Sequence, residues 1–188
     1  MSDYHNIKGY YSNSFLSKVA VEILGLPQLS SDKPCFAFGN EFEDCLLYDK
    51  KTKDPIIKKM VKVTKGHPTF KSFINHPDIK IQHEYYGRFM GIPFKAKADL
   101  LIKGFCVPDI KSTSCTTIKK FIESIYQYNY DRQLYIYMSI FKCDMAVIIA
   151  TTKEKNPKVF VVPIVKNDYV YNSGKSKAIH LISIVKSL

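Results

Sequence analysis

The chain has 188 residues, with 28 Lys or Arg against 17 Asp or Glu, so its formal net charge is +11. A hydrophobic fraction of 46% and a charged fraction of 24% are ordinary for a globular protein and argue against disorder. The length predicts a single domain over residues 1–188, and the basic excess favours a polyanionic partner over a merely basic soluble protein.

The N-terminal third predicts helices, because apolar residues recur there at spacings of three and four. In the first helix Phe15, Val19 and Ile23 fall on one face, and Ser12 or Ser14 can cap its start. The predicted helices cover residues 12–24, 36–48 and 54–63, followed by a turn and a short helix within 67–78.

From residue 79 the apolar period changes to two, which is typical of strands. We predict strands over 79–88, 94–102 and 105–111, helices over 117–126 and 131–141, and strands over 145–151 and 159–165. A closing helix is expected within 167–188, although Gly174 weakens its first half. This order predicts an α/β fold with a mixed central β-sheet and helices on both faces.

The cysteines show no CxxC or Cys/His spacing, so we expect reduced structural thiols and no zinc or iron–sulfur site. No apolar run follows Met1, and no stretch is long enough to span a bilayer. We therefore expect a cytoplasmic, intracellular protein.

The candidate chemistry lies in Asp99 and in the run Pro108-Asp109-Ile110-Lys111. Side chains alternate along a strand, so Asp109 and Lys111 share one face. Two carboxylates can hold a divalent cation, and a neighbouring lysine can orient or deprotonate a water, as phosphodiester hydrolysis requires. An Asp–x–Lys triplet alone is a weak signal, because most such triplets are solvated strand or loop residues.

The turn between the second and third strands decides whether the two aspartates meet. A two-residue turn puts Asp99 and Asp109 on opposite faces. A three-residue loop, 103–105, pairs Ile102 with Cys106 and therefore Asp99 with Asp109. The active-site hypothesis requires this longer loop or an equivalent bulge.

Several segments resemble a known family. GIPFKAKADLLIKGFCVPDIKST (91–113) is similar to the core of the PD-(D/E)XK nuclease superfamily, in its RecB/RecE/lambda exonuclease-like group. YNYDRQLYIY (128–137) resembles that group's QxxxY motif, and FGNEFEDCLL (38–47) resembles its first-helix motif. VIIATTKEKNPKVFVVPI (147–164) is similar to its closing strands, so the resemblance covers nearly the whole chain.

The resemblance implies a restriction-endonuclease-like fold and a metal site. Asp99 and Asp109 would bind Mg²⁺, for which Mn²⁺ could substitute, together with the backbone carbonyl of Ile110 and Glu43. Glu43 stands where histidine is usual, and Glu41 could take its place if the helix register differs.

The resemblance also implies supporting roles around that metal. Lys111 would position the attacking water or stabilise the developing charge. Gln133 and Tyr137 lie four residues apart on a helix and would support the site or touch the DNA backbone. Without the rest of the pattern, a core tyrosine and a solvated glutamine would explain these two residues.

Other polar residues near the motifs carry weaker signals. Glu84 fits a structural role better than catalysis. A further set could contact phosphates or stack on unpaired bases, although solvated charge and core packing explain each member as well: Lys95, Lys97, Lys119, Lys120, Arg132, Tyr126, Tyr128 and Tyr130.

Charge and resemblance together predict a magnesium-dependent DNA exonuclease of phage-type or recombination-type DNA processing, which could act in a phage-infected host. Its partner would be double-stranded DNA with free ends. The resemblance further implies a homo-oligomeric ring and a single-strand-annealing recombinase partner. The alternatives are a structure-selective endonuclease on the same core, a ribonuclease, and a non-catalytic nucleic-acid-binding protein, against which the intact set of Asp99, Asp109 and Lys111 argues.

Overall fold

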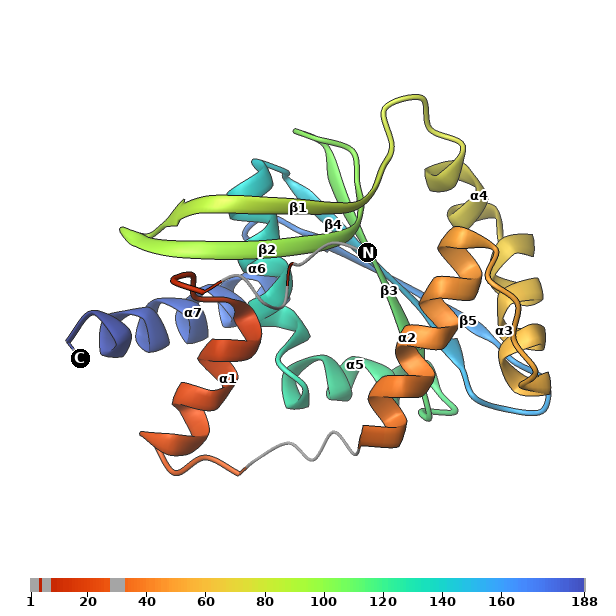
Figure 1. The fold of residues 1–188 in the computed structure, drawn as a ribbon, viewed down its shortest axis with the longest axis horizontal. Coiled ribbons are helices and arrows are strands. Elements are labelled where there is room, and N and C mark those ends of the chain that lie inside the picture. The colour runs from red at the N-terminus through yellow and green to blue at the C-terminus, as the bar shows by residue number, and fades with distance from the viewer. Residues whose placement is uncertain (1–3, 5–7, 28–32, 188) are drawn as a thin grey trace.

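The computed structural model describes residues 4, 8–27 and 33–187. Its elements follow the predicted order along the chain (Figure 1). The first half contains α1 (Asn13–Glu22), α2 (Lys33–Tyr48), α3 (Pro55–Gly66), α4 (Pro68–Ile74), β1 (Lys80–Phe89), β2 (Ile92–Leu101) and β3 (Cys106–Thr113). The second half contains α5 (Ile118–Gln127), α6 (Tyr130–Phe141), β4 (Met145–Thr152), β5 (Val159–Val165) and α7 (Tyr169–Ser187). No helix within these described ranges is both long and apolar enough to cross a membrane.

The strands form a mixed arrangement in two parts. β1 and β2 make an antiparallel hairpin, while β3 pairs parallel with β4 and β4 pairs antiparallel with β5. An antiparallel bridge between Ile102 and Cys106 joins the two parts, with both backbone N–H groups donating across it at 2.9 and 3.0 Å. The predicted three-residue loop over 103–105 is therefore confirmed, and Gly104 supplies the positive φ of 75° that the loop needs.

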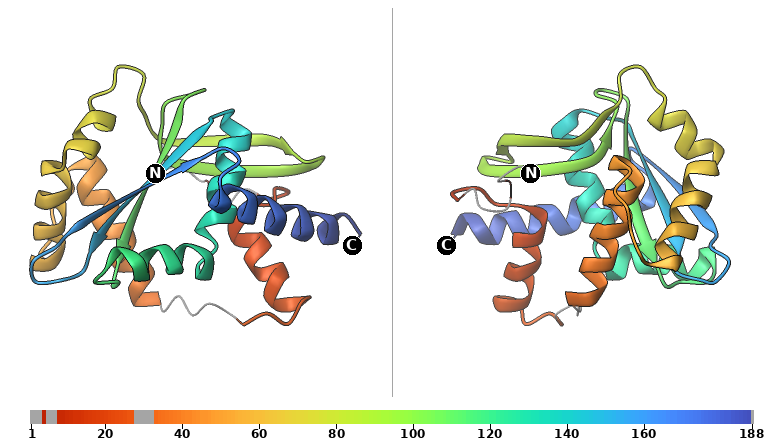
Figure 2. Two further views of the ribbon diagram at one scale, coloured as in Figure 1. Left: turned by 180° about the vertical axis from the view of Figure 1, so that it is seen from behind. Right: turned by 45° about the vertical axis from the view of Figure 1, so that its right-hand side comes forward.

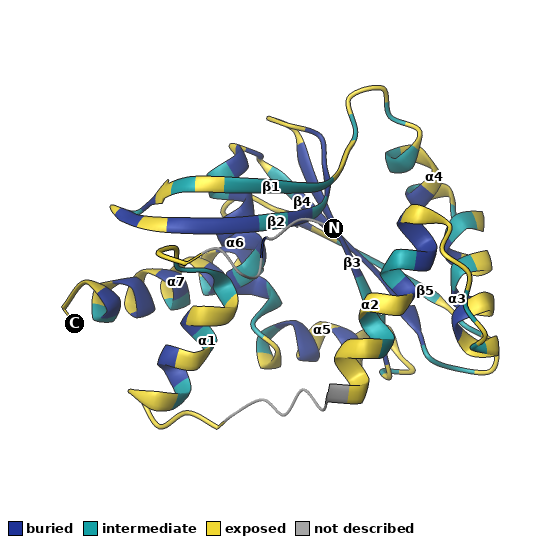
Figure 3. Ribbon diagram, in the orientation of Figure 1, coloured by how far each residue is buried: buried dark blue, intermediate teal, exposed yellow. Residues whose placement is uncertain are grey.

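Helices cover both faces of the three-stranded part, as predicted (Figure 2). Alternate residues of β4 face opposite cores: Ala146 and Ile148 pack with α5, α6 and α7, whereas Val147 and Ile149 pack with α2, α3 and α4. Figure 3 shows the resulting buried strands between more exposed helices. Burial on both faces explains why the central strand β4 is apolar from Met145 to Ala150.

α1 is rotated relative to the predicted apolar face. Phe15 and Ile23, expected to face the core with Val19, are 38% and 46% exposed. The reason lies just before the helix, where Tyr11 pairs with the edge of β2: its N–H donates to the carbonyl of Pro93 at 3.0 Å. This attachment fixes the angle of entry, and the helix buries Leu16, Val19 and Ala20.

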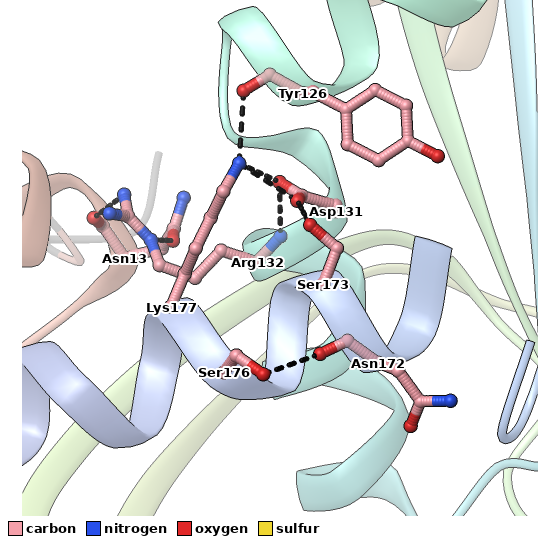
Figure 4. A network of polar contacts seen from close by, with 8 residues as sticks. All are labelled: Asn13, Tyr126, Asp131, Arg132, Asn172, Ser173, Ser176 and Lys177. Atoms are coloured by element: carbon pink, nitrogen blue, oxygen red, sulfur yellow. Dashed lines mark hydrogen bonds and ion pairs between the residues drawn. The ribbon is translucent and has the colours of Figure 1, made fainter. Parts of the chain in front are cut away.

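A buried polar network joins α6 to α7 (Figure 4). The fully buried carboxylate of Asp131 accepts a hydrogen bond from Ser173 Oγ at 2.7 Å, and its Oδ2 lies 2.8 Å from Lys177 Nζ. A Cβ on Gly174 would lie 2.1 Å from the carbonyl oxygen of Asp131. The glycine that weakens the helical pattern is thus required for the two helices to approach each other.

Arg132 belongs to the same junction and does not contact solvent as a phosphate-binding residue would. It is 1% exposed and donates to Asn13 Oδ1 at 2.8 Å and to Ser17 Oγ at 2.6 Å on α1. The expectation that Arg132 could grip DNA is therefore wrong, and its role is to attach α1 to α6.

Candidate active site

Asp99 and Asp109 meet where β2 and β3 separate. Extending the Ile102–Cys106 register places Asp99 opposite Asp109, but the strands have diverged and no ladder pair forms there in the described structure. The Asp99 side chain spans the gap instead, and its Oδ2 accepts a hydrogen bond from the N–H of Ile110 at 2.8 Å. The carboxylate of one strand is therefore held against the backbone of the other.

Asp109 is buried beside a lysine and a glutamine. Its side chain is 1% exposed, Lys111 Nζ lies 2.6 Å from Oδ2, and Gln133 Nε2 donates to Oδ1 at 3.3 Å. The Lys111 ammonium is the partner of Oδ2, which accepts no other hydrogen bond among the described residues. Buried oxygens in proteins nearly always have a partner, and here that partner is a single cationic side chain.

Glu43 reaches the same point from α2. Gln82 Nε2 donates to both Glu43 Oε1 and Asp99 Oδ1, the latter at 3.3 Å. Glu41, the alternative, is exposed and accepts from Thr52 instead, so Glu43 is the one that faces the cluster. Three carboxylates from α2, β2 and β3 are thereby brought together.

Sequence reasoning missed Gln82. It has a φ of 50° and lies opposite Asp99 in the β1–β2 register, although neither residue forms a regular pair there. A signal was present: counting back from a two-residue turn at Met90-Gly91 places Gln82 opposite Asp99.

The electrostatics of the cluster favour a cation. Burial raises the pKa of Glu43 to about 8, with the charge of Asp99 adding to the shift and Lys111 opposing it. Burial also raises the pKa of Asp109 to about 6, against the effect of Lys111. Burial lowers the pKa of Lys111, but Asp109 and Asp99 outweigh it and the net pKa is raised, so the lysine is charged. The raised pKa values of Glu43 and Asp109 show that three carboxyl groups held this close resist ionising together, and a bound cation would favour their charged forms.

The oxygen donors fit a hard divalent cation. Mg²⁺ is usually bound through one or two carboxylates and keeps several waters. The described residues hold no group of three His, Cys, Asp or Glu side chains arranged around one point, since Gln82 holds Glu43 and Asp99 while Lys111 lies against Asp109. Asp99 and Asp109 could hold the cation, with main-chain and water oxygens completing its shell.

The remaining predicted residues divide into two groups. Tyr137 is 7% exposed, and its pKa is raised by burial first and then by Tyr4, Asp99 and Asp109, so it lines the cluster from α6. Lys97 is close enough to lower the pKa of Glu43. Others lie apart from the carboxylates: Lys95 donates to the carbonyl of Tyr4 at 2.7 Å, Glu84 accepts from the Tyr86 hydroxyl at 2.8 Å, and Lys119 and Lys120 are exposed on α5.

The sequence matches, over residues 35–187, a family described as "PDDEXK-like domain of unknown function (DUF3799)". A comparison with curated protein sequences finds no match. The fold is similar to the crystal structure of a protein from Eubacterium rectale that is provisionally described as an exonuclease. That overlay has a TM-score of 0.71 and 15% identity, and it covers 98% of this chain and 83% of that one.

Two further solved structures overlay more loosely. An alkaline exonuclease from Laribacter hongkongensis has a TM-score of 0.46 and 13% identity, with 98% of this chain and 91% of that chain covered. A phage-related exonuclease from Haemophilus somnus has a TM-score of 0.45 and 14% identity, with 91% and 94% covered. At these identities the similarities concern the fold alone.

Proposed function

The chain belongs to the family of PDDEXK-like domains, and we propose that it is a magnesium-dependent deoxyribonuclease that degrades DNA from free ends. The observation that carries the proposal is the buried meeting of Asp99, Asp109 and Lys111. These side chains come from two neighbouring strands, and the two carboxylates repel each other unless a positive charge lies beside them. Burial raises the pKa of Asp109 in spite of Lys111, so its charged form is costly there, and a second cation would offset that cost.

Each residue then has a defined task. Asp99 and Asp109 would hold the cation, joined by the carbonyl of Ile110 and assisted by Glu43. When bound, Mg²⁺ supplies Lewis-acid polarisation of the phosphoryl oxygen and a water of lowered pKa. Lys111, kept charged by its carboxylate neighbours, would donate to the phosphate or orient the water.

Supporting side chains would hold these groups in place. Gln133 donates to Asp109 Oδ1 at 3.3 Å, while Oδ2 faces Lys111. Gln82 connects Glu43 to Asp99. Positions fixed in this way cost little reorganisation during a reaction.

Charge favours a nucleic acid as the substrate. The net charge of +11 consists mostly of lysine, with arginine only at Arg88 and Arg132, and Arg132 is buried. Lysines bind phosphates as point charges, which supports a nuclease indifferent to base sequence. The preference for free ends rests on the likeness to the Eubacterium rectale protein.

The test is the release of nucleotides from linear double-stranded DNA labelled at one end. Wild-type protein should release label with Mg²⁺ and not with EDTA. Asp109→Ala should lower the rate by about 100-fold or more, the order of loss expected when an electrostatic contributor to the transition state is removed. Asp144→Ala is the matched control, because that aspartate is exposed and its side chain pairs with Lys166 at the surface.

Two further substrates separate the alternatives. Cleavage of covalently closed circular DNA at a comparable rate would identify an endonuclease, and faster loss of RNA would identify a ribonuclease. Binding of DNA without cleavage, unchanged by Asp109→Ala, together with calorimetry that detects no Mg²⁺ binding, would refute the catalytic proposal.

A further inference from the structure

An exposed tyrosine is connected to the candidate site through the ring of a second tyrosine. Tyr128, the residue that ends α5, is 46% exposed. Its ring centroid lies 5.9 Å from that of Tyr130, with 32° between the ring planes. Tyr130 is half-buried, and Lys111 Nζ lies 5.2 Å from its ring centroid. Aromatic contacts therefore lead from solvent to the lysine that pairs with Asp109.

The backbone between the two tyrosines explains how their rings meet. In a continuous helix, residues two apart point about 200° away from each other. Asn129 interrupts the helix with φ 57° and ψ 33°, and its side chain makes no capping hydrogen bond to α6. Asparagine tolerates this left-handed conformation better than most residues. The interruption lets Tyr128 and Tyr130 lie side by side, which regular helical geometry would prevent.

Packing explains only one member of the pair. Tyr130 packs against the main hydrophobic core, and Lys111 and Asp109 are among the charges around its hydroxyl. Tyr128 contributes an exposed aromatic ring beside this supported one. Aromatic side chains next to a phosphate-binding lysine are the arrangement by which proteins stack unpaired bases.

We propose that Tyr128, supported by Tyr130, stacks on a nucleobase of an unpaired DNA end whose phosphate is held at Lys111. The proposal rests on the proposed function and adds to it the substrate class: a single strand or a frayed end. A base inside a blunt, fully paired duplex is stacked on its neighbours and cannot offer its face to the ring. Ends with an unpaired nucleotide should therefore bind better than blunt ends.

A second tyrosine pair provides a matched control. Tyr126 and Tyr169 also have ring centroids 5.9 Å apart, and Tyr169 is 80% exposed. The charged neighbours of Tyr126 include Asp131, Asp168 and Lys177, and none of them is a residue of the site. Tyr169→Ala thus removes an exposed, paired tyrosine without touching the proposed platform.

The experiment measures binding without cleavage. Full-length wild type, Tyr128→Ala, Tyr128→Phe and Tyr169→Ala are titrated in EDTA with a short single-stranded oligodeoxynucleotide that carries 2-aminopurine at its end. A blunt hairpin with the same label, paired with thymine, is the second probe. Stacking on an aromatic ring quenches the fluorescence of 2-aminopurine, so affinity and stacking are read from one titration.

We expect Tyr128→Ala to lose the quenching and about tenfold in affinity for the single strand, within the range known for base–aromatic stacking. Tyr128→Phe should retain both, because the ring remains, and Tyr169→Ala should match wild type. Binding of the blunt hairpin should not change. Equal quenching and affinity in Tyr128→Ala, with circular dichroism showing an intact fold, would overturn the proposal. Wild-type cleavage in Mg²⁺, measured separately, tests the nuclease function, so either idea can fail alone.

Discussion

Replacing Gly174 by alanine should destabilise the protein, although alanine is the better helix former. In an exposed helix interior this change stabilises by about 1 kcal/mol. Here the new Cβ would lie 2.1 Å from the carbonyl oxygen and 2.5 Å from the carbonyl carbon of Asp131. Both are backbone atoms, so no side-chain rotation can relieve the overlap, and α6 and α7 must move apart by more than about 1 Å, since carbon atoms pack at about 3.5–4.0 Å.

That movement also strains the polar network around the glycine. Ser173 and Lys177, on either side of Gly174, contact the buried Asp131 carboxylate at 2.7 and 2.8 Å. Overpacking of a core costs about 1–3 kcal/mol, and weakened hydrogen bonds to a buried charge add about 1–3 kcal/mol. After the helix-propensity gain, the net loss should be about 1–5 kcal/mol, or roughly 2–20 °C in Tm for a chain of this size.

Urea unfolding followed by circular dichroism measures the loss. Gly66→Ala is the matched control, because it makes the same change at the last residue of α3, where a Cβ would meet nothing within 4 Å. We expect that variant to equal or exceed wild type in stability by up to about 1 kcal/mol. A Gly174→Ala protein as stable as Gly66→Ala would refute the close approach of α6 and α7.

Three further predictions test the charges. Lys177→Met should lower the free energy of unfolding by about 2–4 kcal/mol, since it leaves the buried Asp131 carboxylate without its cation; an unchanged Tm would contradict this. Because the pKa of Glu43 rises from 4.5 to about 8 on folding, the folded chain keeps a proton that the unfolded chain loses, and metal-free wild type should lose stability as pH rises between these values. Urea titrations in EDTA at several pH values should show that the free energy of unfolding depends less steeply on pH in Glu43→Gln than in wild type. An equally steep dependence on pH would place the effect at another residue. Arg132→Met should accelerate hydrogen exchange in α1, where Arg132 binds Asn13, more than in α7; uniform acceleration would argue against a local attachment.

The order of elements was predictable because local signals are strong in this chain. Asp54 caps α3 with its side chain accepting from the N–H groups of Ile56 and Ile57, and Thr117 caps α5. The apolar period changes where the strands begin. These features depend on residues a few positions apart, so they can be read without knowing the fold.

The site was predictable in part. The pairing of Ile102 with Cys106 follows from one choice of loop length, and that choice brings Asp99 to the backbone of Ile110. The roles of the site residues stay a prediction for the experiments above. The resemblance to the QxxxY motif identified Gln133 and Tyr137. Their spacing of four residues predicts that they share one face of the helix.

Features set by distant packing could not be predicted. Tyr11 pairs with β2 and turns α1 so that Phe15 is exposed, and no local pattern encodes that pairing. Arg132 and Asp131 resemble surface charges in sequence, but α1 and α7 bury them. Such burial depends on helices more than 40 positions away along the chain.

Where β2 diverges from β3, part of one edge of β3 is left without a neighbouring strand. Beyond the bridge at Ile102, β3 has no ladder partner on the β2 side, and a free strand edge is a template for pairing with another chain. The carboxylate of Asp99 occupies the N–H of Ile110 on this edge, and the charges of Asp109 and Lys111 lie beside it. Inward-pointing charges are a recognised protection against edge-to-edge aggregation. The group of side chains that would hold the cation would thus also oppose the addition of a foreign strand to the sheet.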